Sequence, residues 1–582
     1  MRKPKDAKGT FRRTLSYLSG FRGLLFLILL LCLISNLLSL LGPGLAGSAI
    51  DEAAAGKGAV NMEKVAFYAK RMLLCYLTSS LMNIAISVIM QYVSRGIARK
   101  MRGDVFGKIM RLPVGYFDRH QAGDLISRVS YDIDVIATCI ATDLTQILTN
   151  TVTVVGSLVM MLVISLPLSA VMLFTIPLSI LFTFSMRKKT QPRYRKRSES
   201  YGSMNGLVEE LFSGQKTIQA YSYEDRACGR FDEVNLAAEE AYKDAEYYGC
   251  TLGPSAGAIN NGSLALVGVL GCFLYMGGAV GLGQISSFVL YSRKFSGPIN
   301  EIANVINEIF SALSAAERVF ALLDEPEEVV DRENAIELRD VKGDVELEHV
   351  SFGYRPDHLI LHDLSLHANP GETIAIVGPT GAGKTTIINL LMRFYDVSGG
   401  SARCDGRDLR DYTRKSLRSA YAMVLQDTWL FQGTIFENIA YGKENATMEE
   451  VVAAAKAAKI HSFILRLPEG YNTVISEDGS NISKGQKQLL TIARAMLYDT
   501  SMLILDEATS NVDTGTERQV QKAMRELMKG KTCFVIAHRL STIQNADRIL
   551  VLNHGDVVEQ GTHESLMAAG GFYRKLYSAQ FE

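Results

Sequence analysis

The sequence has few cysteines and no excess of either charge. Its 582 residues include eight cysteines, and none of them forms a C-x-x-C pair, so nothing indicates a zinc or redox site. The cysteines are scattered and several lie in apolar runs, which argues against a secreted disulfide scaffold and predicts buried or lipid-facing thiols. The 61 basic and 61 acidic residues cancel, so charge does not indicate a nucleic-acid partner.

We find no internal repeat or low-complexity tract in the sequence, and we predict that its N-terminus is not a cleavable leader. Residues 1–13 are basic, but the apolar run at about 24–45 that follows is long and has no small-residue cleavage site. About 20 apolar residues match the thickness of the hydrocarbon core of a bilayer. We therefore predict that this run is a membrane span.

What the sequence does contain is six apolar runs in its first half. Basic residues precede the first run and follow the second and the fourth, whereas the loops on the other side are short or acidic. Because positive charge stays on the cytoplasmic side, we predict cytoplasmic termini and a multi-pass protein of the inner (cytoplasmic) membrane. The predicted α-helical membrane domain covers 1–325, with six transmembrane helices at about 22–50, 64–92, 138–164, 168–186, 250–276 and 284–312.

Two long polar stretches, 93–137 and 187–249, interrupt the apolar runs. They are too polar for lipid and too periodic for disorder. We predict that spans two to five extend as helices into the cytoplasm, with turns near 115–123 and 213–214. Separate soluble helices are the alternative, but no linker composition sets these stretches apart from the spans.

The second half has a different pattern. Residues 326–343 are polar and are predicted to be a linker. From Val345 onward, strands alternate with helices, which predicts an α/β domain at 344–582 with a mainly parallel sheet covered on both faces. The predicted strands lie near 345–352, 373–378, 501–506 and 533–537.

Residues 378–385 match the phosphate-loop pattern G-x4-G-K-T. They follow the apolar strand 373–377 and open a predicted helix, which is the context that this loop requires. Its glycines let backbone N–H groups turn toward an anion, and the helix N-terminus adds partial positive charge. We expect Lys384 to reach the β- and γ-phosphates and the Thr385 hydroxyl to bind Mg²⁺. The predicted nucleotide-binding residues here are Gly378, Pro379, Thr380, Gly381, Ala382, Gly383, Lys384, Thr385 and Thr386.

A second candidate is the strand at 502–507, which is apolar and ends in two carboxylates. Asp506 is predicted to hold Mg²⁺ through water. Glu507 would point to the other side and polarise a water in line with the γ-phosphate. The alternative is an ordinary strand followed by two solvated acids.

These motifs, in this order along the chain, resemble the nucleotide-binding domain of an ABC transporter, and the resemblance implies that 344–582 is an α/β P-loop ATPase domain. Nearly the whole chain resembles an exporter-type half-transporter of the multidrug or lipid kind, such as one subunit of a heterodimeric bacterial multidrug exporter. The resemblance implies ATP-driven export of amphipathic small molecules, with ATP and Mg²⁺ as cofactors. A lipid floppase remains an alternative, as does an ATP-gated or regulatory subunit with little turnover, although Glu507 and His538 weigh against the latter.

The resemblance assigns roles to further residues. It implies that Tyr354 stacks on adenine, with a core tyrosine as the alternative. Gln426 would touch Mg²⁺ and water, and Asp513 would belong to a loop that crosses to the facing domain. His538 resembles the histidine that contacts the γ-phosphate. The implied catalytic residues are Glu507, His538, Gln426 and Lys384, and the implied metal-binding residues are Thr385, Gln426 and Asp506.

The family's signature, usually Leu-Ser-Gly-Gly-Gln, reads Ile-Ser-Lys-Gly-Gln at 482–486. The resemblance implies that Ser483, Lys484, Gly485 and Gln486 face the ATP of a partner subunit. Lys484 replaces a glycine, which removes φ freedom and adds a long side chain where backbone approaches phosphate. We therefore predict a heterodimer whose partner supplies a consensus signature and a degenerate catalytic site. A homodimer that tolerates Lys484 is the alternative.

Two segments resemble the cytoplasmic tips of exporters, at 112–118 and 210–220. Such tips would dock on the nucleotide domains, one of them on the partner's domain, and would meet the segment 473–479. A rigid helical extension could then transmit closure of the nucleotide domains to the spans.

The sixth predicted span carries polar residues on one face. Polar side chains inside a bilayer usually face protein or a water-filled cavity. We therefore predict that this face lines the transport path, with hydrogen bonding between helices as the alternative. The residues are Asn300, Asn304, Asn307 and Glu308, with Arg293 and Lys294 one to two turns earlier and Asn260 and Asn261 in the fifth span.

Overall fold

The computed structural model describes residues 6–54, 56, 60–355, 357–426, 428–476, 481–506, 514–537 and 540–581. The chain forms two compact units. The first comprises Met1–Arg111 and Gln121–Glu325, and the second comprises Leu112–His120 and Pro326–Glu582. The chain therefore enters the second unit twice, because a short segment from within the membrane half packs with the C-terminal domain.

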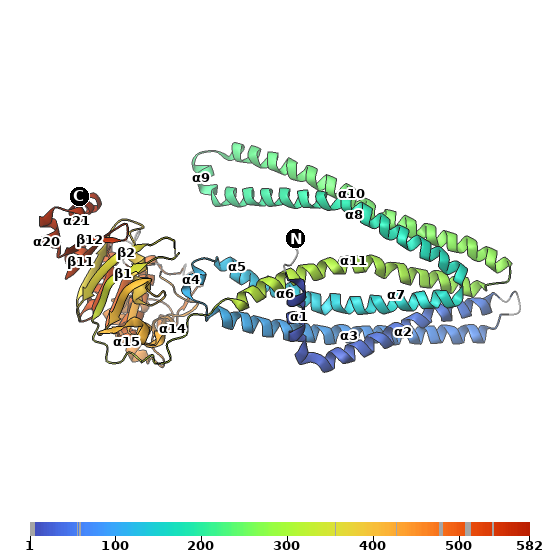
Figure 1. Ribbon diagram of the computed structural model, residues 1–582, viewed down its shortest axis with the longest axis horizontal. Coiled ribbons are helices and arrows are strands. Elements are labelled where there is room, and N and C mark those ends of the chain that lie inside the picture. The colour runs from blue at the N-terminus through green and yellow to red at the C-terminus, as the bar shows by residue number, and fades with distance from the viewer. Residues whose placement is uncertain are drawn as a thin grey trace. The chain divides into compact units, whose positions relative to one another are not determined.

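Long helices build the first unit (Figure 1). Four helical stretches of its described residues are long and apolar enough to cross a membrane, namely Ala7–Ala53, Met62–Ile109, Ala122–Ile164 and Glu224–Met276. The predicted fourth and sixth spans lie within α8 and α11, so the count of six spans stays a prediction. The helices are α1 (Ala7–Leu18), η1 (Ser19–Phe21), α2 (Arg22–Ala53), α3 (Met62–Ile109), α5 (Ala122–Ser127), α6 (Ile133–Thr138), α7 (Leu144–Ile164), α8 (Leu166–Ser213), α9 (Gln215–Ala220), α10 (Glu224–Met276) and α11 (Leu282–Asp324), with π-helical segments at η2 (Arg128–Asp132) and η3 (Cys139–Asp143).

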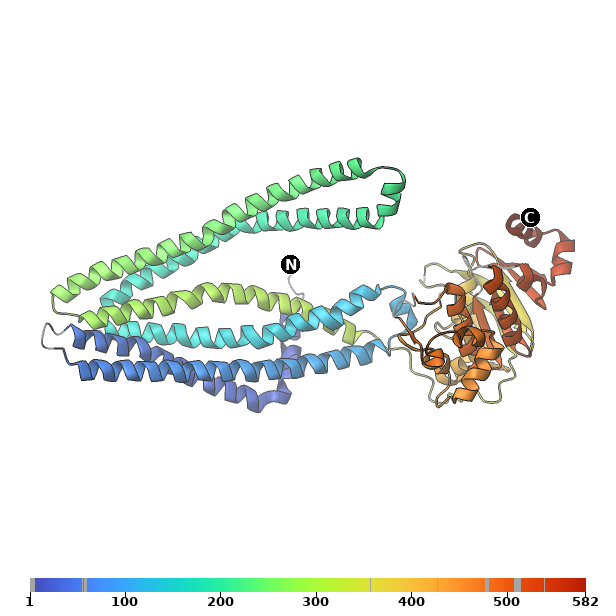
Figure 2. The ribbon, with the colours of Figure 1, turned by 180° about the vertical axis from the view of Figure 1, so that it is seen from behind.

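The polar stretches continue the spans as helices, as predicted. α3 runs without a break through its apolar half and its polar half, and α8 and α10 lie side by side in their middle parts in both ribbon views (Figures 1 and 2). α8 ends at Ser213 with Gly214 as its C-cap, which is where the sequence predicted a turn. Between α7 and α8, Ser165 adopts an extended φ of −162°, and Pro167 stands in the first turn of α8, where proline fits a helix start.

Interhelical hydrogen bonds satisfy polar groups within the first unit. Tyr291 of α11 is fully buried and donates its hydroxyl to the Leu40 carbonyl of α2 at 2.6 Å. Ser287, one turn earlier, donates to the Pro43 carbonyl at 2.8 Å. Where water is scarce, such bonds fix the register between helices.

All eight cysteines are free thiols. Cys32, Cys404 and Cys533 are buried. Cys228 is exposed in the part of α10 that lies outside the predicted spans. The prediction that all eight are buried or lipid-facing therefore does not fit this residue.

The second unit contains a six-stranded sheet in the order β12-β11-β3-β10-β9-β6. Its strands pair in parallel except at β12, which is antiparallel to β11. The prediction of a mainly parallel sheet is confirmed for these strands, whereas the predicted strand at 345–352 belongs to a second, antiparallel sheet ordered β2-β1-β4-β5. The strands are β1 (Val345–Phe352), β2 (Leu361–Ala368), β3 (Thr373–Val377), β4 (Gly399–Cys404), β5 (Arg407–Asp408), β6 (Tyr421–Val424), β7 (Gly433–Thr434), β8 (Val474–Ile475), β9 (Met502–Asp506), β10 (Thr532–Ile536), β11 (Arg548–Asn553) and β12 (Asp556–Gly561).

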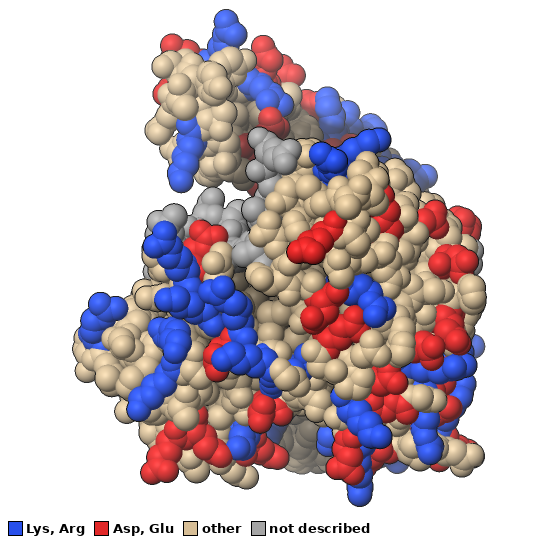
Figure 3. All heavy atoms as spheres, turned by 90° about the vertical axis from the view of Figure 1, so that its left-hand side faces the viewer, with Lys and Arg blue, Asp and Glu red and all other residues tan. Residues whose placement is uncertain are grey.

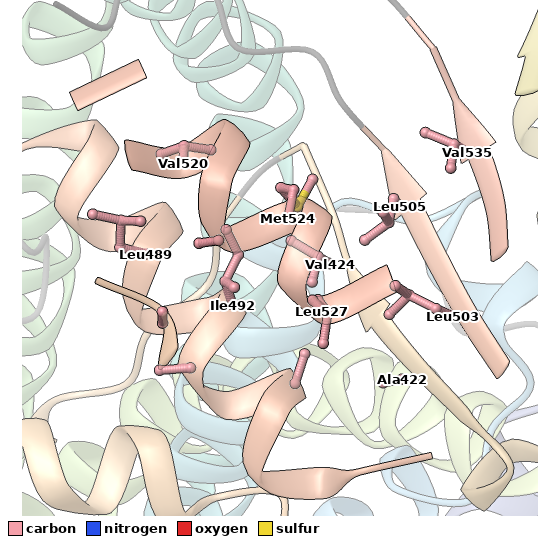
Figure 4. Close-up of a cluster of buried hydrophobic side chains, with 14 of the residues drawn as sticks. Ala422, Val424, Leu489, Ile492, Leu503, Leu505, Val520, Met524, Leu527 and Val535 are labelled. Atoms are coloured by element: carbon pink, nitrogen blue, oxygen red, sulfur yellow. The ribbon is translucent and has the colours of Figure 1, made fainter. Parts of the chain in front are cut away.

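Helices cover the six-stranded sheet and bury its apolar strands. Figure 4 shows side chains of α17 and α18 packed against β6, β9 and β10, among them Leu489, Met524 and Leu505. Each large aliphatic side chain buried in this way stabilises the fold by about 1.5–3 kcal/mol. The helices of this unit are α4 (Val114–Phe117), α12 (Lys384–Leu391), η4 (Leu409–Asp411), α13 (Arg414–Ser419), α14 (Ile435–Ala440), α15 (Met448–Ala457), α16 (His461–Ile464), η5 (Gly470–Asn472), α17 (Lys484–Tyr498), α18 (Thr514–Met528), α19 (Leu540–Gln544), α20 (His563–Ala569) and α21 (Phe572–Phe581).

Acidic and basic side chains both appear across the face of the molecule in Figure 3. This agrees with the equal numbers of basic and acidic residues in the chain.

Residues 326–331, part of the predicted linker, are bound to the second unit by the buried Arg414 and the partly buried Arg418. Arg414, whose side chain is 9% exposed, donates to the Val329 carbonyl at 2.7 Å and to Asp331 at 3.0 Å. Arg418 forms an ion pair with Glu328 at 2.5 Å. The chain is therefore held on the domain from within a few residues of the end of α11.

Candidate functional site

The loop at 378–383 joins β3 to α12, as its sequence pattern predicted. Gly383 is the N-cap of α12 and has a φ of +99°, a left-handed conformation that favours glycine. Gly378 lies so close to β11 that a Cβ would stand 2.4 Å from the Leu552 carbonyl oxygen. Both positions need glycine, so the loop has the tight backbone path that presents N–H groups to an anion.

Lys384 folds back over this loop. Its ammonium donates to the Gly378 carbonyl at 2.7 Å and to the Pro379 carbonyl at 3.0 Å. Burial holds the pKa of Lys384 below its ordinary value, and the nearby carboxylate of Asp506 acts in the opposite direction. A half-buried ammonium held at a phosphate-type loop is placed to bind an anion in exchange for the loop carbonyls.

Asp506 lies at the same edge of the sheet as the phosphate loop, because both lie at the carboxyl ends of parallel strands of that sheet. Asp506, the last residue of β9, pairs with Ile536 of β10. Ile536 in turn pairs with Ile376, the next-to-last residue of β3, so Asp506 lies at the sheet edge from which the phosphate loop leaves β3. Thr385 is exposed at the start of α12. A hydroxyl and a carboxylate near a phosphate loop are the oxygen donors that Mg²⁺ prefers, so these residues fit the predicted metal.

Gln426 lies two residues beyond β6, the strand next to β9, and is exposed. Val424 is opposite Leu505, so the chain after β6 leaves the sheet at the same edge as Asp506. The resemblance alone predicted that Gln426 contacts Mg²⁺, and this stays a prediction; its position at the same sheet edge as Asp506 is compatible with it.

Tyr354 follows β1, and its side chain is not a core side chain. It is 46% exposed, and its hydroxyl accepts a hydrogen bond from Asn389 Nδ2 at 2.9 Å and lies 3.3 Å from Thr386 Oγ1. Its ring meets Phe352 and Tyr395 edge to face, with centroids 5.1 and 5.0 Å apart. Asn389 and Tyr395 were missed by the sequence analysis, because neither belongs to a motif.

The signature segment begins α17. Ser483 is the N-cap, its Oγ accepts from Gln486 N at 3.3 Å, and its own N–H donates to Gln486 Oε1 at 2.8 Å. Lys484 is the first helical residue and is exposed, whereas Gly485 is buried. The prediction that a lysine at 484 suffers from lost φ freedom is wrong. Lys484 lies in the first turn of α17, where the backbone has helical φ and ψ that L-residues adopt without strain. The long side chain at this position remains a difference from the family pattern.

Three predicted residues lie outside the part of the chain that the structure describes. They are Glu507, Asp513 and His538. β9 ends at Asp506, directly before Glu507, and β10 ends at Ile536, two residues before His538. Their roles remain expectations.

The first predicted cytoplasmic tip packs in the second unit. Leu112–His120 contains the short helix α4, and within it Leu112 and Tyr116 are buried. The hydroxyl of Tyr395 donates to Asp118 Oδ2 at 2.5 Å. The second predicted tip, at the end of α8 and in α9, belongs to the first unit.

The polar residues predicted in the sixth span are only partly described. Glu308 and Arg293 are exposed on α11, whereas nothing is described of the side chains of Asn300, Asn304 and Asn307. Lys294 donates to the carbonyl and the hydroxyl of Ser39 in α2, at 2.7 and 2.6 Å, so it ties two helices together. In the fifth span, Asn260 is half-buried and Asn261 is exposed.

Comparisons with known proteins agree with this arrangement. Residues 25–299 match the family model described as the ABC transporter transmembrane region, and residues 361–510 match the model described as ABC transporter. An uncharacterised ABC transporter ATP-binding protein of Bacillus subtilis, YfiC, is 42% identical over 580 residues, which cover 100% of this chain and 96% of that protein.

Two further matches bear on transport. A fatty acid ABC transporter ATP-binding/permease protein of Mycobacterium bovis is 44% identical over 504 residues, which cover 87% of this chain and 80% of that protein. The structure of a bacterial Atm1-family ABC exporter with ATP bound matches with a TM-score of 0.76 and 30% identity, over 99% of both chains. This chain therefore belongs to the ABC transporter family, as an exporter-type half-transporter whose fused membrane and ATP-binding domains couple ATP hydrolysis to transport.

Proposed function

We propose that this half-transporter exports amphipathic molecules across the cytoplasmic membrane. The phosphate loop with Lys384 over it, beside Asp506 at the edge of the parallel sheet, is the observation that carries ATP-driven transport. Relatives support the class of cargo, since one is described as a fatty acid transporter and another, from Syntrophus aciditrophicus and 34% identical, as a lipid A-core flippase.

The chain's own residues supply the chemistry of hydrolysis. In our proposal, the loop N–H groups and Lys384 hold the phosphates, and Tyr354 stacks on adenine. Glu507 orients the attacking water, with Gln426 and His538 contacting the water and the γ-phosphate. Thr385, Gln426 and Asp506 would hold Mg²⁺, which when bound offsets the negative charge of the phosphate oxygens.

Reconstituted vesicles test the proposed cargo. With the ATPase domain outside, ATP should drive labelled fatty acids, phospholipids or amphipathic dyes into the vesicle lumen or the inner leaflet, and vesicles with a Lys384→Met variant should show no such movement. If the purified assembly hydrolyses ATP at a rate indifferent to all three kinds of probe and moves none of them, the proposal fails.

A lipid floppase is the second candidate, because the flippase relative is described as moving a lipid. The same vesicles separate the candidates. A floppase transfers labelled lipid between leaflets without filling the lumen with dye, whereas an exporter of soluble amphiphiles accumulates dye in the lumen.

We also propose that the second subunit of the transporter is a different half-transporter. The support is the exposed Lys484 side chain at the start of α17, where the family has a glycine. The proposed partner would have a consensus signature and a degenerate catalytic site. Native mass spectrometry of the complex from its own host should give a mass of two unlike chains, whereas an active dimer of this chain alone would refute the proposal.

We propose that one face of α11 lines the transport path. Arg293, Glu301 and Glu308 lie within one face of the helix and are exposed. Each charge near the middle of a bilayer would cost about 2.5–3.5 kcal/mol against lipid, so this face should meet a cavity or the partner. Glu301 also accepts a hydrogen bond from Asn150 of α7 at 3.3 Å, which is an instance of the alternative role, hydrogen bonding between helices. Cargo-stimulated ATPase unchanged by both Asn304→Ala and Glu308→Gln would exclude the path role.

A further inference from the structure

Three aromatic rings meet beside the proposed adenine site. Tyr354, Phe352 and Tyr395 contact one another, with centroids 5.0–5.5 Å apart. The Tyr354–Tyr395 pair is edge to face at 83°, a favoured geometry that contributes about 0.5–1.5 kcal/mol beyond its buried area. The ring of Tyr395 therefore helps to set the plane of Tyr354.

The other end of Tyr354 is held by the helix of the phosphate loop. Asn389 donates to its hydroxyl, and Thr386 lies within hydrogen-bond distance of it. Both belong to α12. The ring that we propose to face adenine is thus fixed through its hydroxyl by α12 and through its edge by Tyr395, while nearly half of the side chain stays exposed.

The hydroxyl of Tyr395 reaches a different part of the chain. It donates to Asp118, which is the C-cap of α4 in the tip Leu112–His120. Burial, together with this hydrogen bond, raises the pKa of Tyr395, so its hydroxyl stays protonated and is the donor. The fit is close, because a Cβ on Gly115 would stand 2.8 Å from the same hydroxyl oxygen.

We propose that Tyr395 is a positioning residue that links the adenine site to the tip Leu112–His120: its ring orients Tyr354 and its hydroxyl holds Asp118. Binding of adenine to Tyr354 and packing of the tip against the domain then favour each other. This coupling must act equally in both directions, since it is a free energy shared between two sites. The proposal rests on the proposed stacking of adenine on Tyr354.

The two halves of the link can be cut separately. Tyr395→Phe keeps the ring and removes the donor to Asp118, so it should uncouple the tip and raise the KM for ATP only by the factor that the coupling contributes, which is less than in Tyr395→Ala. Tyr395→Ala removes both, and should raise the KM for ATP by about 2- to 10-fold with kcat little changed, in line with the loss of an aromatic pair. Affinity for inorganic tripolyphosphate, which has no base, should change in neither variant.

Amide hydrogen exchange in the full-length complex measures directly how well residues 112–120 are protected. In the parent, ATP with EDTA, which prevents turnover, should slow exchange in residues 112–120. In Tyr395→Phe and Asp118→Ala this ATP-dependent protection should be lost, and the double variant should be no worse than either single one. The matched control is Tyr412→Phe, which removes a buried hydroxyl bonded to the Cys404 carbonyl and should leave the protection intact.

The outcomes separate this inference from the function on which it rests. Full ATP-dependent protection in Tyr395→Phe would overturn the link. So would an unchanged KM in Tyr395→Ala if Tyr354→Ala raises it. If Tyr354→Ala leaves the KM for ATP unchanged, the stacking of adenine on Tyr354 is refuted, and the link to the base falls with it.

Discussion

Lys384 shows how a single residue can be costly for the fold and required by the site. Its ammonium is half-buried, and the lowered pKa means that burial makes the charged form less favourable in the folded domain than in the unfolded chain. The bonds to two loop carbonyls offset part of that cost. A phosphate would satisfy the ammonium better than the carbonyls do.

Lys384→Met should therefore lose activity without losing stability. We expect ATPase activity to fall by about 10²- to 10³-fold, as for other donors that meet developing charge, while the melting temperature without nucleotide stays equal or rises. Phosphate release and differential scanning fluorimetry measure the two effects.

The control for this prediction is Lys529→Met, which removes an exposed lysine paired with Glu526. It should change neither quantity. A melting temperature lowered only by the Lys384 substitution would show that the ammonium stabilises the empty loop.

Lys484 shows that a sequence motif does not reveal the backbone conformation of each of its residues. The glycine-rich signature suggested a backbone requirement at this position, but the helix starts one residue earlier, with Ser483 as its cap. Whether a position needs glycine depends on where the helix begins, and the family pattern does not show this.

Two helix caps of the second unit share one geometry and differ in proposed role. Ser483 caps α17 and Thr447 caps α15, each with a reciprocal bond three residues on. Ser483→Ala and Thr447→Ala should each destabilise the domain by about 1 kcal/mol.

Only Ser483→Ala should also lower the ATPase activity of the assembled transporter, because only that hydroxyl is proposed to face the partner's ATP. Chemical denaturation and phosphate release of both variants make the comparison. Equal activity losses would mean that the signature serine acts through stability alone.

The contacts of Arg414 and Arg418 with residues 326–331 should stabilise the second unit. Asp331 accepts from the backbone N–H of Arg414 and from its guanidinium. Asp331→Ala leaves a largely buried guanidinium short of a partner, so it should cost about 1–3 kcal/mol of unfolding free energy. Glu333→Ala, an exposed acid two residues on, should cost less than about 0.5 kcal/mol. Equal values for the two variants in urea denaturation would contradict this account.

Periodicity and motifs predicted the elements better than their contacts. The continuous α3, the turn at Gly214, the parallel strands and the strand–loop–helix of the phosphate site all follow from local patterns. The antiparallel pairing of β1 with β2 and β4 depends on which strands meet in space. The Tyr395–Asp118 bond joins residues 277 positions apart, and no local pattern indicates such a pair.

For the whole molecule, removing the metal provides a test of the assembled site. Thr385, Gln426 and Asp506 offer neutral and anionic oxygens but no cluster of charge, so we expect Mg²⁺ to bind chiefly together with ATP. EDTA should abolish ATPase activity in the transporter while ATP binding persists, and added Mg²⁺ should restore the rate. Turnover that continues in excess EDTA would contradict the proposed metal ligands.

The second unit is assembled from two separate pieces of sequence, and this sets the terms for studying it in isolation. A truncated ATPase fragment that starts at 344 would lack Glu328 and Asp331, so Arg418 would lose its ion pair and Arg414 would keep only Asp396, and the fragment should aggregate. One that starts at Pro326 keeps them but still omits the α4 stretch, leaving Tyr395 with water in place of Asp118. Supplying that stretch as a synthetic peptide, or grafting it through a short tether, would complete the domain outside the membrane.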